Sequence, residues 1–144
     1  MKIEEFKQEL LRSSVCTQGL FRKLIVPVCQ KFELTLQQLF ILGCLYQEDN
    51  QTPRQISEQI GVSPNNFSSI CKKLEANGWV ERIVNEADKR ASVLHLTVDG
   101  RRLIREMEQD MEQRYGAIFE QVPKETFRKI REGLDALYDL SLRI

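Results

Sequence analysis

This sequence of 144 residues contains few of the residues and motifs that form metal or catalytic sites. It contains one histidine, and its four cysteines show no C-x-x-C spacing, so neither a structural zinc site nor a histidine-centred catalytic site is expected. No glycine-rich phosphate loop or paired carboxylate motif is present. Apolar runs are far shorter than the roughly 18–20 residues that span a bilayer, and the acidic N-terminus is unlike a signal peptide. We therefore expect a cytoplasmic protein that is not an enzyme, with no metal, cofactor or membrane partner.

An excess of charge of either sign is also missing, because 21 basic residues balance 21 acidic ones. The distribution is uneven: residues 51–102 carry eight basic and six acidic residues, whereas residues 103–144 carry seven and nine. A positive bias of this size predicts weak non-specific binding of DNA by one copy of the chain. Two copies on one duplex would present a larger basic surface.

Residues 52–78 carry the start and stop signals of two short helices. Thr52 and Pro53 begin the first helix as N-cap and first helical residue, and Gln55 completes a capping box. Gly61 breaks that helix, and a Ser-Pro pair at residues 63–64 begins the second, which stops at an Asn-Gly pair. Two capped helices joined by a turn of about three or four residues with a glycine predict a helix-turn-helix.

The second of these helices has two different faces. Apolar side chains form an inward stripe at helical spacing: Phe67, Ile70, Cys71 and Leu74. The opposite face carries small polar and basic side chains: Asn65, Asn66, Ser68, Ser69, Lys72 and Lys73. Asparagine and serine hydrogen-bond to base edges or phosphates, and lysine neutralises phosphate. A solvated surface is the simpler interpretation for an isolated helix, but its place after a capped helix and turn favours a DNA-recognition helix.

A predicted β-hairpin follows. Residues 79–84 and 92–97 have the composition of strands, and a polar segment over residues 85–90 separates them. A hairpin beside a recognition helix is a wing, and Lys89 and Arg90 at its tip would reach a minor groove or a run of phosphates. Asp88 is unusual at a DNA-facing tip, and we expect it to pair with Arg90 or with an arginine behind the wing. The alternative is a solvated tip with no partner.

These residues resemble the signature of the MarR (multiple antibiotic resistance regulator) family. The resemblance rests on the helix end 74–78, on Arg82, on the Asp-x-Arg of residues 88–90 and on the Leu-Thr-x-x-Gly of residues 96–100; Trp79 stands where leucine is more usual. It implies a mainly α fold with a small β-wing, in which terminal helices add a dimerisation domain to a winged helix-turn-helix domain. Pattern and resemblance together predict a DNA-binding surface made of these residues: Arg54, Ser63, Asn65, Asn66, Ser68, Ser69, Lys72, Lys73, Arg82, Asp88, Lys89 and Arg90.

Long helices are predicted on either side of this lobe. Apolar residues recur every three or four positions near the N-terminus, where Pro27 should kink or end the helix. Thr35 begins a central, buried helix. Thr97 caps a long helix that ends before Pro123, and the last helix carries a heptad-like apolar stripe. We expect residues 34–102 to form the DNA-binding domain and residues 1–33 and 103–144 to form the dimerisation helices; packing within one chain is the alternative.

The family resemblance implies control by a small molecule or an oxidant, with an effector cavity between the dimerisation helices and the DNA-binding lobe. Ser13 and Thr17 in the first helix, with Met107 and Met111, could line a cavity that is apolar with a few polar groups. The alternative is that they are packing residues and no effector exists. Some relatives sense oxidants through a cysteine in the first helix, which makes Cys16 a redox candidate, although no tyrosine or second cysteine lies close to it in the sequence.

The single histidine, His95, alternates with leucines in the second predicted strand, which predicts a side chain that points outward. The whole pattern predicts a homodimeric transcriptional repressor that binds a near-palindromic operator in double-stranded DNA and is released by a small-molecule effector. A redox-sensing regulator acting through Cys16 is one alternative. A winged-helix module that binds protein instead of DNA is another, although such a surface should show an aromatic or apolar anchor.

Overall fold

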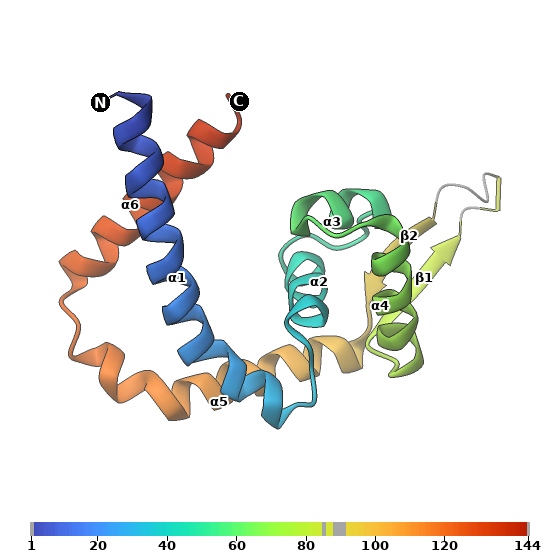
Figure 1. The fold of residues 1–144 in the computed structure, drawn as a ribbon. Helices are drawn as coiled ribbons and strands as arrows, with labels where there is room; N and C mark the ends of the chain where they lie inside the picture. Colours follow the sequence, from blue (N-terminus) through green and yellow to red (C-terminus); the bar gives the residue numbers. More distant parts are fainter. Residues whose placement is uncertain (1, 85, 88–91, 144) are drawn as a thin grey trace. The chain divides into compact units, whose positions relative to one another are not determined.

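The computed structural model describes residues 2–84, 86–87 and 92–143. These residues form six helices and two strands, in two compact units that span residues 1–109 and 110–144 (Figure 1). The prediction of a mainly α fold with a small β-wing is therefore confirmed. Within this described part, no helix is long and apolar enough to cross a membrane.

The first unit begins with a long helix, α1 (Ile3–Lys31), whose N-terminal part is exposed. The sequence predicts a kink or an end at Pro27, but α1 does not end there: it continues to Lys31 and stops where Glu33 takes a φ of 54°. Proline removes one backbone hydrogen bond from a helix. The burial of Val28 and Cys29 directly after it favours the helical path and offsets that loss.

Three shorter helices follow: α2 (Leu36–Gln47), α3 (Pro53–Ile60) and α4 (Pro64–Ala76). Each begins as predicted, because the hydroxyl oxygens of Thr35, Thr52 and Ser63 accept a hydrogen bond from the backbone N–H three residues on. Gly61 ends α3 at a φ of 68°, in the left-handed region that glycine adopts without steric cost. The predicted central place of α2 is confirmed, since it contacts α1, α3 and α4 (Figure 1).

The wing consists of the antiparallel strands β1 (Val80–Val84) and β2 (Ser92–Leu96). Gln51, in the loop before α3, pairs with Leu94 on the other side of β2. The core of the first unit joins the wing to the helices, and these side chains are among the most deeply buried: Val28, Ile41, Leu42, Leu45, Ile56, Cys71, Leu74, Val80, Leu94 and Leu96. The inward stripe predicted for α4 is confirmed, because all four of its residues are buried.

The junction between the wing and α5 (Val98–Glu120) explains the Leu-Thr-x-x-Gly motif. The Thr97 hydroxyl donates to the Gly78 carbonyl oxygen at 2.6 Å and accepts from the Gly100 N–H at 3.0 Å, so Thr97 caps α5 as predicted. A Cβ atom on Gly100 would lie only 2.2 Å from the Trp79 carbonyl oxygen. Glycine is therefore required where α5 passes the chain that leaves α4.

α5 runs into the second unit, where α6 (Lys124–Ser141) follows Pro123 as predicted. The rings of Phe119 and Phe127 stack with their centroids 5.7 Å apart across the turn between the two helices. No residue in the described part of α6 is buried. Its apolar stripe is exposed to solvent: Phe127, Ile130, Leu134, Leu137 and Tyr138.

Replacing Gly100 with alanine should lower the free energy of unfolding by about 1–3 kcal/mol, the usual cost of forcing a group into a packed site, because the Trp79 carbonyl oxygen must move. Gly43→Ala is the matched control. Gly43 lies inside α2 with open space around its Cβ position, so the better helix former should raise the free energy of unfolding slightly. Urea unfolding measures both. Equal stability of the two variants would contradict a crowded junction.

Candidate nucleic-acid interface

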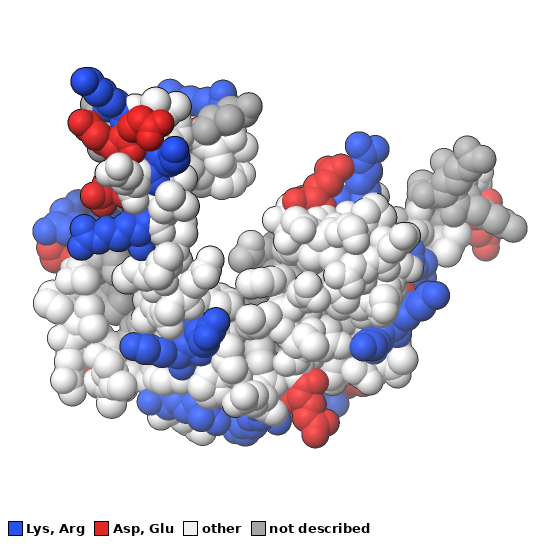
Figure 2. Space-filling model, viewed as in Figure 1, with Lys and Arg blue, Asp and Glu red and all other residues white. Residues whose placement is uncertain are grey.

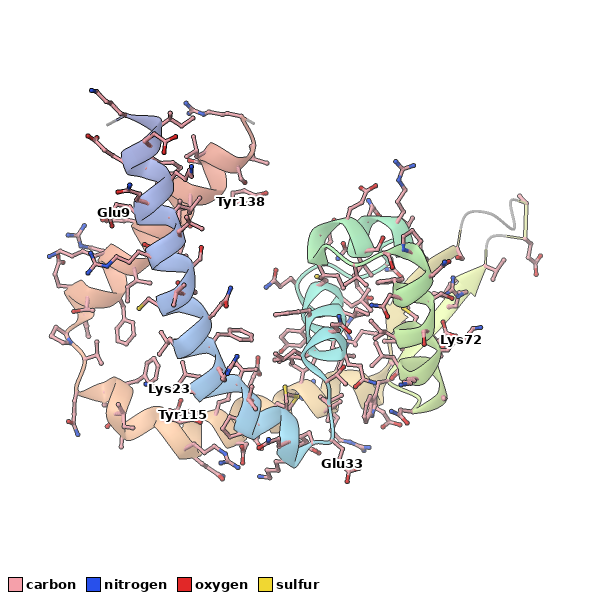
Figure 3. All side chains as sticks on the ribbon, in the orientation of Figure 1. Glu9, Lys23, Glu33, Lys72, Tyr115 and Tyr138 are labelled. Atoms are coloured by element: carbon pink, nitrogen blue, oxygen red, sulfur yellow. The ribbon has the colours of Figure 1, made fainter. Side chains whose placement is uncertain are left out.

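The outer face of α4 is open to solvent along its length. The residues predicted for DNA contact on α4 and at its cap are all exposed: Ser63, Asn65, Asn66, Ser68, Ser69, Lys72 and Lys73. Lysine and arginine side chains project from this side of the lobe (Figure 2), and Lys72 points away from α2 (Figure 3). The face therefore offers amide, hydroxyl and ammonium groups, which hydrogen-bond to base edges and attract phosphate.

A hollow of about 380 Å³ lies between the N-terminal ends of α3 and α4. Its lining combines apolar side chains with two guanidinium groups: Pro53, Arg54, Ser57, Pro64, Phe67, Ser68 and Arg82. Helix N-termini carry unpaired N–H groups and a partial positive charge. Together with the two arginines, they make the mouth of this hollow attractive to an anion.

Both arginines at the hollow have partners within the chain. Arg54 Nε donates to Glu58 Oε1 at 2.8 Å, and this carboxylate raises the pKa of the exposed Arg54 guanidinium. Arg82 Nε donates to Glu75 Oε1, near the end of α4, at 3.3 Å. Arg82 Nη1 donates to the Ser92 hydroxyl oxygen on β2 at 3.1 Å. Arg82 thus braces the two wing strands against α4, a role that its residue type alone did not indicate.

The predicted contacts at the tip of the wing, Asp88, Lys89 and Arg90, lie outside the described residues. The ion pair expected for Asp88 therefore stays a prediction. At the base of the wing, the edge strand β1 exposes Glu81 and Ile83.

No sequence pattern points to the polar cluster around Asp49, in the loop between α2 and α3. Asp49 Oδ1 accepts from the Leu96 N–H at 3.0 Å, and Oδ2 forms an ion pair with Arg101. His95 Nδ1 lies 3.0 Å from the same Oδ2, and His95 Nε2 lies 3.9 Å from Glu81 Oε1. His95 is partly exposed between the buried Leu94 and Leu96, which agrees with the predicted alternation. Its Nδ1 atom is nevertheless buried, because the loop that carries Asp49 packs against β2.

Gln51 ties the same loop to its neighbours. Its buried side chain donates from Nε2 to the carbonyl oxygens of Cys44 and Glu48, at 3.0 Å and 2.6 Å, and accepts from Gln59 Nε2 at 2.7 Å. Its backbone carbonyl oxygen accepts from the Leu94 N–H at 2.8 Å. Residues 49–51 therefore fix β2 and the start of α5 relative to α2 and α3.

The residues predicted to line an effector cavity stay a prediction. Ser13 and Thr17 are exposed on α1, and the Thr17 hydroxyl donates to the Ser13 carbonyl oxygen at 2.7 Å. Met107 is buried in the first unit, whereas Met111 belongs to the second unit.

The cysteines differ in exposure. Burial raises the pKa of the Cys29 and Cys44 thiols and raises that of Cys71 to about 11, so these thiols stay protonated near neutral pH. Cys16 is exposed on α1 and is the cysteine that an oxidant in solution would reach; its redox role stays a prediction. Among the residues that the structure describes, no group of three histidine, cysteine, aspartate or glutamate side chains could hold a metal ion.

Residues 34–92, which include α2, the helix-turn-helix and most of the wing, match the sequence model of the MarR family. The helix-turn-helix segment of the chain is therefore similar to the MarR family. FarR of Neisseria gonorrhoeae, an HTH-type transcriptional regulator, is 26% identical over 77% of this chain and 76% of its own length. YfiV of Bacillus subtilis, an HTH-type transcriptional regulator, is 25% identical over 74% of this chain and 67% of its own length. The organic hydroperoxide resistance transcriptional regulator of the same organism is 27% identical over 51% of this chain and 50% of its own length. The matched segment and these relatives identify the chain as a DNA-binding transcriptional regulator, as the sequence predicts.

Solved structures share the fold. NadR in complex with 4-hydroxyphenylacetate has a TM-score of 0.78 at 21% identity, covering 92% of this chain and 96% of that one. A variant of S. aureus MepR bound to an oligodeoxyribonucleotide has a TM-score of 0.63 at 20% identity, covering 92% and 96%. At these identities the likeness concerns the fold, and it confirms the predicted winged-helix architecture.

Proposed function

We propose that this regulator is a homodimeric repressor of the MarR type that places α4 of each copy in a major groove of a near-palindromic operator. The observation that carries the proposal is the outer face of α4, where polar and basic side chains are exposed on a helix whose other face is buried. Such a helix fits the major groove and reads base edges from its first turns. Asn65 and Ser69 suit that reading, and Lys72 and Lys73 would neutralise phosphates.

Phosphates beside the groove would be held at two further places. One is the hollow between α3 and α4, where Arg54 and the cap residue Ser63 lie near the helix N-termini. The other is the wing, through Lys89 and Arg90. Arg82 would support both places, because it holds the wing strands beside α4.

Two copies are needed for useful affinity, because one chain carries no net charge and offers few phosphate contacts. The apolar stripe of α6 supports the terminal segments, residues 1–33 and 103–144, as the dimer interface: the exposed fractions of Leu134 and Leu137 are 57% and 41%. Large exposed apolar patches mark interaction surfaces. In a two-fold dimer the same surface of each copy meets its equivalent.

A small-molecule effector would release the dimer from its operator by changing the separation of the two recognition helices. The structure of NadR with 4-hydroxyphenylacetate supports this class of control. Ser13, Thr17, Met107 and Met111 remain the candidate lining residues.

Replacing Lys72 with alanine should weaken binding to every DNA sequence and reduce the slope of log K against log salt concentration by about one, because one phosphate contact is lost. The probe is a duplex that the parent protein selects from a random-sequence pool, measured by fluorescence anisotropy at several salt concentrations. Lys7→Ala is the control, since Lys7 is an exposed lysine on α1 that pairs with Glu4; it should leave the slope unchanged. Binding by the parent that ignores salt would contradict a DNA-binding surface.

Placing two carboxylates in the apolar stripe, with Leu134→Asp and Leu137→Asp together, should convert the dimer to monomers, because an unpaired charge in an apolar interface is costly. Light scattering gives the mass, and circular dichroism checks that the helices remain. Ala136→Asp is the control: it places the same charge on the other side of α6 and should keep the dimer. An unchanged mass for the double variant would move the interface elsewhere.

A further inference from the structure

Four ionisable side chains meet where the wing joins the helices: Asp49, Glu81, His95 and Arg101. They come from four different elements, namely the loop between α2 and α3, β1, β2 and α5. Asp49 is the most buried, with an exposed side-chain fraction of 18%, against 32% for His95 and 36% for Arg101. This cluster lies apart from the outer face of α4, which belongs to another element.

Asp49 uses both carboxylate oxygens as ties between elements. Oδ1 accepts from the Leu96 N–H in β2 at 3.0 Å and from the Asn50 N–H at 3.0 Å. Oδ2 faces Arg101 of α5 and His95 of β2. The chain turns at Asn50, whose φ is 60°, and α3 begins at Pro53. One carboxylate thus connects the entry to the helix-turn-helix with the wing and with α5.

The ring of His95 has a carboxylate beside each nitrogen. Nδ1 lies 3.0 Å from Asp49 Oδ2 and Nε2 lies 3.9 Å from Glu81 Oε1. Nδ1 is buried and makes no hydrogen bond. The ring thus lies between the loop that carries Asp49 and the edge strand β1.

We propose that Asp49 and His95 are positioning residues that hold the wing at a fixed place relative to α4. The DNA part of the proposal rests on the proposed function, in which α4 and the wing contact one duplex. Two contact surfaces joined rigidly bind more tightly than two that move independently, since the second contact costs less entropy. Asp49 and His95 would raise the affinity in this way without touching DNA.

Asp49→Asn separates positioning from overall charge. The asparagine oxygen can still accept from the Leu96 N–H, but the charge that faces Arg101 and His95 is lost. Removing a negative charge from a DNA-binding lobe should by itself strengthen DNA binding. The proposal predicts the opposite, an affinity about tenfold weaker for the duplex selected by the parent.

Asp99→Asn is the matched control for that variant. It removes an exposed carboxylate of α5 that pairs with Arg102 at 2.9 Å. Asp99 is not one of the four side chains of the cluster around Asp49. Its affinity should equal or exceed that of the parent. An Asp49→Asn affinity equal to or above that of the parent would overturn the positioning role.

His95→Gln tests the histidine. Loss of the ring removes the contact between β2 and the loop that carries Asp49. DNA affinity should therefore fall several-fold, while the slope of log K against log salt concentration stays that of the parent, because no phosphate contact is lost. An unchanged affinity or a reduced slope would overturn the positioning role of His95. Urea unfolding checks that the variant keeps the stability of the parent.

A readout without DNA distinguishes this proposal from the proposed function. Hydrogen exchange of the Leu94 and Leu96 amides, followed by NMR on the free protein, should be faster in Asp49→Asn than in the parent, because the loop would hold β2 less firmly. Identical exchange in the two proteins would overturn the role of Asp49. A parent that bound no duplex would instead refute the proposed function, and the exchange rates would still decide whether Asp49 holds the wing.

Discussion

The hydrogen bond from the Leu94 N–H to the Gln51 carbonyl oxygen, 2.8 Å long, ties the wing to the helices. On their own, β1 and β2 would form a two-stranded hairpin, which is marginally stable in water at best. With it β2 is paired on both edges, and Leu94 and Leu96 are fully buried in the core. The place of the wing beside α4 depends on this pairing of β2 with Gln51. The close approach of Gly100 to the Trp79 carbonyl oxygen attaches the other end of the wing to α5.

A chain with no net charge binds DNA through the distribution of its charges. Lys72 and Lys73 stand on the open face of α4, while Arg54 and Arg82 are partly neutralised by Glu58 and Glu75. Few cations per copy are free to meet phosphate, so a single lobe would bind weakly. In the proposed dimer, two lobes on one duplex would supply the missing contacts, which gives the exposed stripe of α6 a physical reason to pair with its equivalent.

The parts predicted from sequence are those that local chemistry determines. Thr52, Ser63 and Thr97 cap their helices because capping needs one hydroxyl and the backbone N–H groups two or three residues on, and the two faces of α4 follow from helical spacing. The cluster at Asp49 could not be predicted in this way, since it joins a loop to Leu96 and Arg101, 47 and 52 residues further along the chain. The brace from Arg82 to Ser92 spans only ten residues, but it depends on the register of the two strands, which their composition does not determine. Of the two outcomes predicted at Pro27, a kink or an end, the end is not observed, because α1 continues to Lys31.

The central claim is that two copies of α4 enter successive major grooves on one face of a duplex. A hydroxyl-radical footprint of the parent protein on its selected duplex tests this most directly. The account predicts two protected segments related by a dyad, with their centres about one helical turn, or roughly 10 base pairs, apart. A single protected segment without two-fold symmetry would contradict it.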